Sequence, residues 1–196
     1  MIYLASRSPR RQELLARIGV RFEVLAPAED EAEAAEALEA LLPGERPSEY
    51  VLRVTLAKAR AGEARRQARN LPPAPVLAAD TTVALGGRIL GKPADAAQAT
   101  AMLRALSGRS HRVLTAVALA RGKRIEHRVS ASRVRFARLT AADIATYVAT
   151  GDPFDKAGAY GIQGYAGRFV RNIEGSESGI MGLPLYETHC LLRRLT

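Results

Sequence analysis

The chain of 196 residues contains a single cysteine and no tryptophan. Because a disulfide needs two thiols, the lone Cys190 excludes an intrachain disulfide framework and a cysteine-rich zinc site. The longest mainly apolar stretch, Val113 to Ala120, is far shorter than the roughly 20 residues of a membrane-spanning helix. Arg7, Arg10 and Arg11 follow the apolar N-terminal residues instead of preceding them, which argues against a secretory signal. We therefore expect a cytoplasmic protein with no membrane partner.

Lysine and aromatic residues are also scarce. Only four of the 29 basic residues are lysine, namely Lys58, Lys92, Lys123 and Lys156. The formal net charge of +9 suggests a nucleic-acid partner, but we interpret the arginine excess as a consequence of coding base composition. The basic segment Arg121 to Arg138 lacks the interleaved aromatic residues on which bases stack. The net charge alone therefore does not indicate a nucleic-acid partner, and we expect none.

The residues present indicate a mixed α/β fold, which we expect to form one domain over residues 1–196. Hydrophobic content is 47% and charged content 25%, as in soluble globular proteins. Periodicity and capping residues predict helices over Pro9–Ile18, Ala32–Leu42, Ser48–Arg69, Asp95–Leu106, Ala141–Ala149 and Leu183–Leu195. Apolar runs and turn residues predict strands over Ile2–Ala5, Phe22–Ala26, Val76–Ala79, Val83–Leu85, Arg88–Leu90, Arg112–Arg121, Arg124–Ala137 and Phe169–Ile173.

The turn between the first strand and the first helix is a candidate anion site. Ser8 is a good N-cap and Pro9 suits the first helical position. A helix N-terminus favours a bound anion, and Arg10 and Arg11 in its first turn would need a counter-charge such as phosphate. The alternative is that both arginines are solvated surface residues.

Asp80 follows a predicted buried strand, at the edge where open α/β sheets usually bind ligands. A carboxylate there can hold Mg²⁺ or activate water, although an Asp that caps its own turn is equally consistent. The acidic cluster Glu29 to Glu31 could complete a metal site with Asp80, or consist of solvated loop residues.

Two glycine-containing segments could contact a ligand. Lys92 lies between Gly91 and Pro93, whose backbones restrict where its ammonium points. Residues 155–164 are rich in glycine and alanine, which allows close approach of the backbone to a ligand. Within them Gln163 offers both a donor and an acceptor to a base edge. A tightly packed turn without a ligand is the alternative.

Taken together, these segments resemble the Maf family of nucleoside triphosphate pyrophosphatases. The matching blocks run in family order over nearly the whole chain: Leu4–Leu15 (LASRSPRRQELL), Ala79–Thr81 (ADT), Gly91–Pro93 (GKP), Asp155–Gly158 (DKAG) and Gly182–Leu185 (GLPL). The resemblance implies an elongated, twisted mixed sheet in two lobes, similar to the inosine-triphosphatase fold, with the substrate in a central cleft.

The resemblance also implies an activity, hydrolysis of a nucleotide to its monophosphate and pyrophosphate with Mg²⁺ or Mn²⁺. By position, Asp80 is expected to be the catalytic carboxylate, with Glu31 as the second carboxylate at the metal. The substrate-binding residues that it implies are Ser8, Arg10, Arg11, Lys58, Thr81, Lys92, Lys156 and Gln163. A homodimer and a link to septation control are further expectations from the family.

Within the family, Arg10, Thr81 and Gln163 are similar to the dTTP/UTP branch and differ from the 7-methyl-GTP branch. The Gln163 amide can pair with O4 and N3–H of uracil or thymine, which leaves the 5-position open to modified pyrimidines. The alternative function is a non-enzymatic nucleic-acid or septum-associated binding protein that uses the basic surface. Pyrophosphate release with Mg²⁺ and a panel of nucleotides distinguishes the two.

Overall fold

The structure, a computed structural model, describes residues 1–195 and the side chains of residues 1–194. One mixed sheet has the strand order β2-β1-β3-β5-β6-β7, and β4 pairs with β3. The strands are β1 (Ile2–Leu4), β2 (Phe22–Val24), β3 (Val76–Leu85), β4 (Arg88–Leu90), β5 (Ser110–Arg121), β6 (Arg124–Phe136) and β7 (Val170–Glu174). The helices are α1 (Pro9–Arg17), α2 (Ala32–Ala37), α3 (Pro47–Ala68), α4 (Ala96–Leu106), α5 (Ala141–Ala149), α6 (Glu177–Met181) and α7 (Leu185–Leu195), with 3₁₀ turns η1 (Ala157–Ala159) and η2 (Tyr165–Phe169). The mixed α/β class is confirmed.

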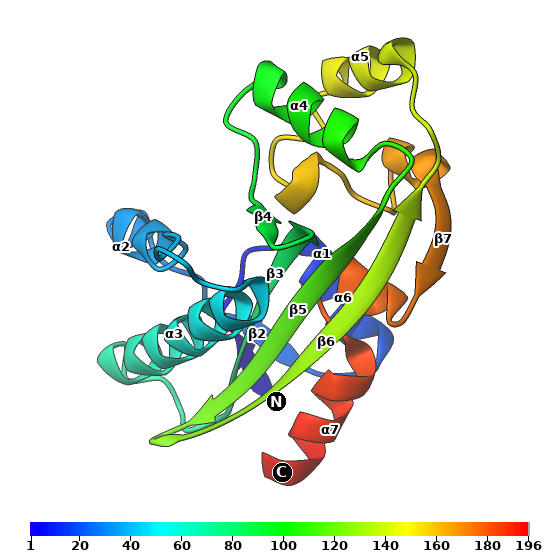
Figure 1. Cartoon of the computed structure of the whole chain (residues 1–196). Coiled ribbons are helices and arrows are strands. Elements are labelled where there is room, and N and C mark those ends of the chain that lie inside the picture. Colours follow the sequence, from blue (N-terminus) through cyan, green and yellow to red (C-terminus); the bar gives the residue numbers. More distant parts are fainter. Residues whose placement is uncertain (196) are drawn as a thin grey trace.

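The sheet is elongated because β5 and β6 pair along their whole length, from Ser110 with Arg135 to Arg121 with Arg124. These two strands run through the molecule and carry a lobe at each end (Figure 1). β1 is parallel to β2 and β3, whereas the other pairs are antiparallel. No helix in the described part of the chain is both long and apolar enough to cross a lipid bilayer.

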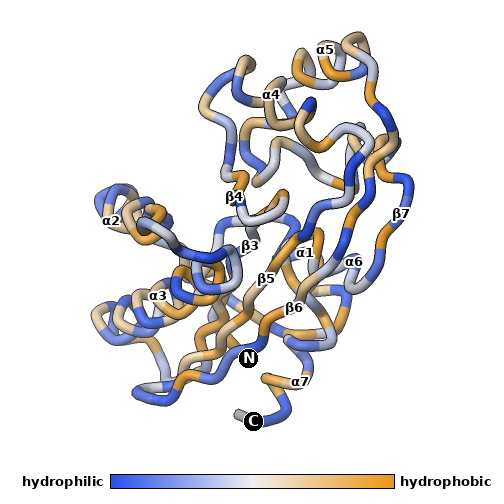
Figure 2. The backbone as a smooth tube through the Cα atoms, in the orientation of Figure 1, coloured by the Kyte–Doolittle hydropathy of each residue, from blue (hydrophilic) through white to orange (hydrophobic). Residues whose placement is uncertain are grey.

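In the first lobe, helices cover both faces of the sheet, and side-chain size differs between the faces. On the face toward α3, the β5 side chains beyond Leu114 are small, namely Ala116, Ala118 and Ala120. Gly62 of α3 comes so close that a Cβ there would lie 2.9 Å from side-chain atoms of Ala5 and Val76. On the other face, the larger Val117 and Leu119 pack against α1 and α7. Figure 2 shows this apolar stretch along β5.

The second lobe has a core of its own, in which β4, α4, α5, η1, η2 and the far ends of β5 and β6 meet. Its largest members are aromatic: Phe136, Tyr147, Tyr160 and Phe169. Edge-on ring contacts link Phe136 to Tyr160 and Phe169. The separate cores account for the two lobes that the sequence led us to expect.

β3 is continuous from Val76 to Leu85, so the predicted end of this strand at Ala79, with a turn at Asp80, was wrong. The reason is tertiary, because antiparallel pairing with β5 covers the whole segment. On its other edge, β3 pairs with β1 only at residues 76–77 and with β4 only at residues 83–85. Among the described strands, none pairs with this edge at residues 79–82. We call this interrupted edge, which lies between the two lobes, the notch.

The predicted caps Ser8 and Thr140 begin their helices as expected. Each accepts a hydrogen bond from the backbone N–H three residues later, and so does Asp95, which precedes α4 instead of lying inside it. Ser48, expected to cap α3, instead lies inside it, because Pro47 occupies the first helical position. The helix predicted over 32–42 ends at Ala37, the final helix begins at Leu185 rather than Leu183, and α6 was not anticipated.

Candidate active site

The notch gives a ligand access to side chains on both faces of the sheet. Asp80 and Thr81 are adjacent on β3, so their side chains point to opposite faces. Asp80 points toward α3, whereas the Thr81 hydroxyl lies 2.9 Å from the Thr115 hydroxyl on the face that carries α6. Thr115 in turn donates to the Gly179 carbonyl of α6 at 2.7 Å. A molecule in the notch can therefore contact both Asp80 and Thr81.

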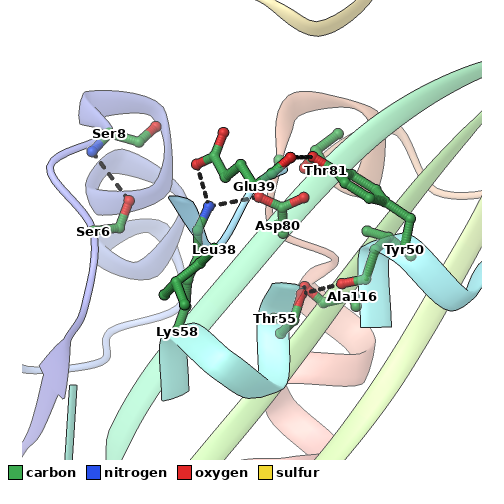
Figure 3. A network of polar contacts seen from close by, with 12 residues as sticks. Ser6, Ser8, Leu38, Glu39, Tyr50, Thr55, Lys58, Asp80, Thr81 and Ala116 are labelled. Carbon is green, nitrogen blue, oxygen red and sulfur yellow. Dashed lines mark hydrogen bonds and ion pairs between the residues drawn. The ribbon is translucent and has the colours of Figure 1, made fainter. Parts of the chain in front are cut away.

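Lys58 of α3 binds two carboxylates at the notch (Figure 3). Its Nζ lies 2.7 Å from Asp80 Oδ1 and 2.6 Å from Glu39 Oε1. The Asp80 and Lys58 side chains are only 10% and 20% exposed, so water and salt screen this pair weakly. Lys92, in the loop after β4, lies 3.6 Å from the other carboxylate oxygen of Glu39. Four segments that are distant in sequence thus meet around two carboxylates.

Glu39 lies between α2 and α3, and side chains of α3 hold its backbone. The Tyr50 hydroxyl donates to the Glu39 carbonyl at 3.0 Å (Figure 3). Arg53 donates to the carbonyls of Leu38 and Ala40 at 3.2 and 2.8 Å. These bonds explain why the helix does not continue to Leu42, since the carbonyls that follow Ala37 are turned toward α3.

The structure does not bring Glu31, the second carboxylate expected at the metal, to Asp80. The Glu31 carboxylate accepts from Arg65 Nε at 2.8 Å, and this hydrogen bond holds the pKa of Glu31 below its usual value. Arg65 lies seven residues beyond Lys58 on α3, about 10 Å further along the helix axis. The carboxylate that shares Lys58 with Asp80 is Glu39.

The sequence did not reveal Glu39, Tyr50 or Arg53 as members of the site. Glu39 is one of eight carboxylates in residues 29–49, and no spacing distinguishes it from the others. The available signal was the i, i+3 spacing of Tyr50 and Arg53, which places a phenol and a guanidinium on one helix face. The Arg53 guanidinium indeed lies 5.6 Å from the centre of the Tyr50 ring.

Positive charge exceeds negative charge at the notch. Burial acts to raise the pKa of Glu39, but Lys58, Lys92 and Arg11 outweigh it and hold this pKa below its usual value. Burial lowers the pKa of Arg11, while Asp80 and Glu39 act in the opposite direction. Arginine stays protonated in proteins, so three cations face two carboxylates. This surplus suits an anionic ligand.

Arg11 reaches the notch from the first turn of α1. Its Nε donates to the Gly182 carbonyl at 2.9 Å and its Nη1 to the Ser6 hydroxyl at 3.2 Å. Ser8 caps the helix by accepting the N–H of Arg11. A Cβ on Gly182 would lie 3.6 Å from Thr81 Oγ1 and 3.7 Å from Arg11 Nε, so Thr81 and Arg11 are neighbours. The helix N-terminus adds further positive potential here.

A second lysine cluster lies in the other lobe. Lys156 Nζ is 2.8 Å from Asp152 Oδ1 and 2.6 Å from Asp155 Oδ1. Asp155 also pairs with Arg10 of α1 at 3.5 Å, which links the two lobes. Gln163 follows in an exposed turn. Arg10, Lys156 and Gln163 thus form a second group of the expected substrate-binding residues.

The oxygen ligands at the notch fit a hard divalent cation. Asp80 and Glu39 both direct a carboxylate oxygen at the Lys58 ammonium, so a divalent cation that displaced the ammonium from this position would meet two carboxylates. Mg²⁺ commonly takes one or two carboxylates and completes its shell with water and substrate phosphates. In the part of the chain that the structure describes, no three His, Cys, Asp or Glu side chains are grouped as a metal site. An ion here would therefore need ligands from water or substrate.

A ligand with several negative charges is what the notch accommodates best, so the fold and the site define an α/β protein that binds polyphosphates. The family described as "Maf-like protein" matches residues 1–195. The chain belongs to the Maf family.

Proteins similar to this chain are named dTTP/UTP pyrophosphatase. One from Burkholderia pseudomallei (strain 1710b) is 62% identical over 194 residues, which are 98% of this chain and 92% of that protein. One from Ralstonia nicotianae is 62% identical and covers 97% of this chain and 92% of its own. One from Cupriavidus pinatubonensis is 60% identical, with coverages of 98% and 96%.

Among solved structures, the Ham1 protein of Staphylococcus aureus aligns with a TM-score of 0.43 at 16% identity. The alignment covers 86% of this chain and 90% of that one. A likeness at this level says nothing about activity.

Proposed function

We propose that the protein hydrolyses dTTP and UTP, together with 5-modified pyrimidine analogues, to the nucleoside monophosphate and pyrophosphate. The observation that carries the proposal is the notch, where Asp80 and Glu39 share Lys58 under a surplus of cations. The name dTTP/UTP pyrophosphatase, carried by relatives that are 60 to 62% identical, supports the same activity.

The reaction needs a base close to the α-phosphorus. Water attacks that phosphorus, and the bond to the oxygen that bridges the α- and β-phosphates breaks. One dTTP and one water give dTMP, pyrophosphate and a proton. Asp80 takes the proton from water, because its side chain is the more buried of the two notch carboxylates, at 10% against 33% exposed. Lys58, at 2.7 Å, fixes the orientation of this carboxylate.

The cations bind the phosphates and the leaving pyrophosphate. Lys92, Arg11 and the N-terminus of α1 stabilise negative charge at the notch, and Lys156 and Arg10 extend the same role into the second lobe. Phosphoryl transfer depends mostly on positioning and on this electrostatic stabilisation. Ser8 supports the helix N-terminus as its cap.

Mg²⁺ or Mn²⁺ is part of the proposal, with Asp80 and Glu39 as its protein ligands. When bound, the ion would neutralise phosphate charge and favour the deprotonated form of a bound water. Glu39 replaces Glu31 in this role, because it is the carboxylate that shares Lys58 with Asp80.

We assign base recognition to Gln163. The Gln163 amide can accept from N3–H and donate to O4 of a uracil or thymine ring. This pairing uses N3–H and O4 and does not involve the 5-position, so thymine and uracil are both accepted.

The first test replaces Asp80 with Asn. We expect pyrophosphate release from dTTP and UTP to fall by about 10²-fold or more, while nucleotide binding, measured by equilibrium dialysis, persists. Asp30→Asn, the same change at an exposed loop residue, is the matched control and should leave turnover unchanged. Near-normal turnover in Asp80→Asn contradicts the proposal. So does a wild-type protein that releases no pyrophosphate but binds DNA or RNA in a salt-sensitive way.

A homodimer and a link to septation control remain predictions from the family resemblance, and a cytoplasmic location remains a prediction from the sequence composition. Light scattering coupled to gel filtration tests the homodimer, and imaging of a tagged chain in cells tests the location. Division timing in cells that carry Asp80→Asn tests the link to septation control.

A further inference from the structure

A buried histidine outside the notch has no part in the proposed reaction. His111 of β5 is 2% exposed, and its Nε2 lies 2.7 Å from the hydroxyl of Tyr160, which is itself 5% exposed. The Phe136 ring packs edge-on against both, with ring centres 5.1 Å from His111 and 4.8 Å from Tyr160. His111 Nδ1 has no hydrogen-bond partner among the described residues. Within the described residues, the His111 imidazole is thus held by its hydrogen bond to the Tyr160 hydroxyl.

Tyr160 follows a strained stretch of backbone. Gly158 and Ala159 are consecutive residues with positive φ, +71° and +61°. Alanine disfavours this conformation because its Cβ approaches the following carbonyl, yet Ala159 is completely buried. Such strain persists only where the surroundings hold it. The His111–Tyr160 hydrogen bond lies one residue further along the chain and supplies such a constraint.

The strained stretch is tied to the loop that carries Lys92. The N–H of Gly158 donates to the carbonyl of Gly91, the residue before Lys92, at 3.0 Å. Gly158 also lies so close to Val83 of β3 that a Cβ would come within 2.9 to 3.0 Å of its side chain. A shift of Gly158 would therefore move the Lys92 loop or collide with β3.

Gly161, the residue after Tyr160, lies close to the side chains of Lys156 and Arg10. A Cβ at Gly161 would lie 2.8 Å from Lys156 Cε and 3.5 Å from an Arg10 guanidinium nitrogen. The path of the chain at Gly161 therefore limits the space that is open to these two side chains. Gln163 follows two residues later, so the direction of this segment also sets the position of its amide.

We propose that His111 is a positioning residue of the substrate site. By binding the Tyr160 hydroxyl it fixes residues 158–161, and through them it sets the KM for the triphosphate and the preference for a pyrimidine base. The proposal rests on the proposed function and deepens it. His111 itself touches no substrate, because it lies within the second-lobe core.

The chemistry of the imidazole agrees with this role. Burial lowers the pKa of His111 to about 4, so the ring is uncharged at neutral pH. An uncharged ring can pair with a phenol inside an apolar core, where a charge would be costly.

The experiment compares three substitutions by steady-state kinetics with dTTP, UTP and GTP. His111→Leu removes the hydrogen-bonding ring, Tyr160→Phe removes only the hydroxyl, and His111→Gln places an amide near the position of Nε2. We expect the first two to raise KM for dTTP and UTP about tenfold with a smaller effect on kcat, since misplaced contacts cost binding and alignment. They should also lower the ratio of kcat/KM for dTTP over GTP. His111→Gln should recover most of both properties.

The control is Thr188→Val, which removes another buried hydroxyl hydrogen bond, to the Pro184 carbonyl at 2.8 Å in α7. We expect it to lower the midpoint of thermal unfolding and leave the substrate ratio unchanged. If His111→Leu behaves in the same way, His111 is a structural residue only and the proposal is overturned. If His111→Leu does not fold, the comparison of Tyr160→Phe with wild type decides the question alone.

Two outcomes separate this proposal from the proposed function. Additive effects of His111→Leu and Tyr160→Phe in the double variant would show that the pair is not coupled, and would overturn the positioning role alone. An unchanged substrate ratio in Gln163→Ala would instead overturn base recognition in the proposed function. Because the two results concern different variants, each failure is identified separately.

Discussion

The two lobes each hold a lysine between two carboxylates, but the two arrangements differ in origin and exposure. Lys58 takes its partners from distant segments, with Asp80 on β3 and Glu39 before α3. Lys156 takes Asp152 and Asp155, which precede it by four and one residues. The clusters differ in one carboxylate, since Asp80 is 10% exposed and Asp155 is 70% exposed, whereas Glu39 and Asp152 are 33% and 34% exposed.

This difference indicates different roles for the two clusters. A buried carboxylate interacts strongly with its partners and can serve as a base. An exposed one is screened and exchanges readily with other anions. We therefore assign chemistry to the Lys58 cluster and phosphate binding to the Lys156 cluster.

The largest expected effect is the difference in kcat for dTTP between the variants Glu39→Gln and Glu31→Gln. Loss of the Glu39 charge should lower kcat for dTTP by about 10²- to 10³-fold, because it removes a carboxylate from the reacting centre. Glu31 pairs with Arg65 instead, so Glu31→Gln should leave kcat nearly unchanged and lower only the unfolding temperature. Steady-state assays of both variants at saturating metal measure this. The reverse pattern would restore Glu31 as the second carboxylate.

The next effect is on the pH dependence of stability, because the core of the second lobe buries the ionisable ring of His111. Unfolded histidine titrates near pH 6.5, whereas burial lowers the pKa of His111 to about 4. Between pH 4 and 6.5 the His111 ring binds a proton in the unfolded chain but not in the folded protein. The contribution of the buried neutral ring to the free energy of unfolding is therefore complete above pH 6.5 and is lost as the pH falls toward 4. The loss is about 3 kcal/mol. Urea unfolding at pH 7.5 and 4.5 should show a smaller drop in His111→Gln than in wild type; equal drops would contradict the prediction.

The smallest effect concerns Asp155, which competes with substrate phosphates for Lys156 and Arg10. Asp155→Asn should lower KM for dTTP by about two- to threefold, because an exposed ion pair contributes under about 1 kcal/mol. The gain should shrink as salt is added, since exposed charges are screened. KM measured at low and high ionic strength tests this, and a raised KM would show that Asp155 supports Lys156 instead of competing for it.

Much of the fold could be predicted because its signals are local. The caps at Asp95 and Thr140 act within three residues, and the paired strands β5 and β6 flank a short turn at Gly122. Continuity of β3 could not be predicted in this way. Asp80 and Thr81 resemble a turn locally, but pairing with β5, more than 30 residues away, keeps them in the strand.

The site residues also divide into those that local sequence features indicate and those that long-range contacts place. Lys58, Lys92 and Lys156 stood out because lysine is rare in this chain, and each lies in an ion pair with a site carboxylate. Glu39 did not stand out, because contact with Tyr50 and Lys58 of α3, and not its local sequence, places it at the notch.

Residue types and short spacings were enough to predict the mixed α/β class, the caps at Ser8 and Thr140, and the cations, and the ordered sequence blocks indicated the family. Contacts in the folded chain place Asp80 at an interrupted strand edge, join Glu39 instead of Glu31 to it through Lys58, and bring His111 to Tyr160. Cross-strand pairing and long-range contacts join residues tens of positions apart, and no local pattern records which of several equivalent side chains the folded chain brings together.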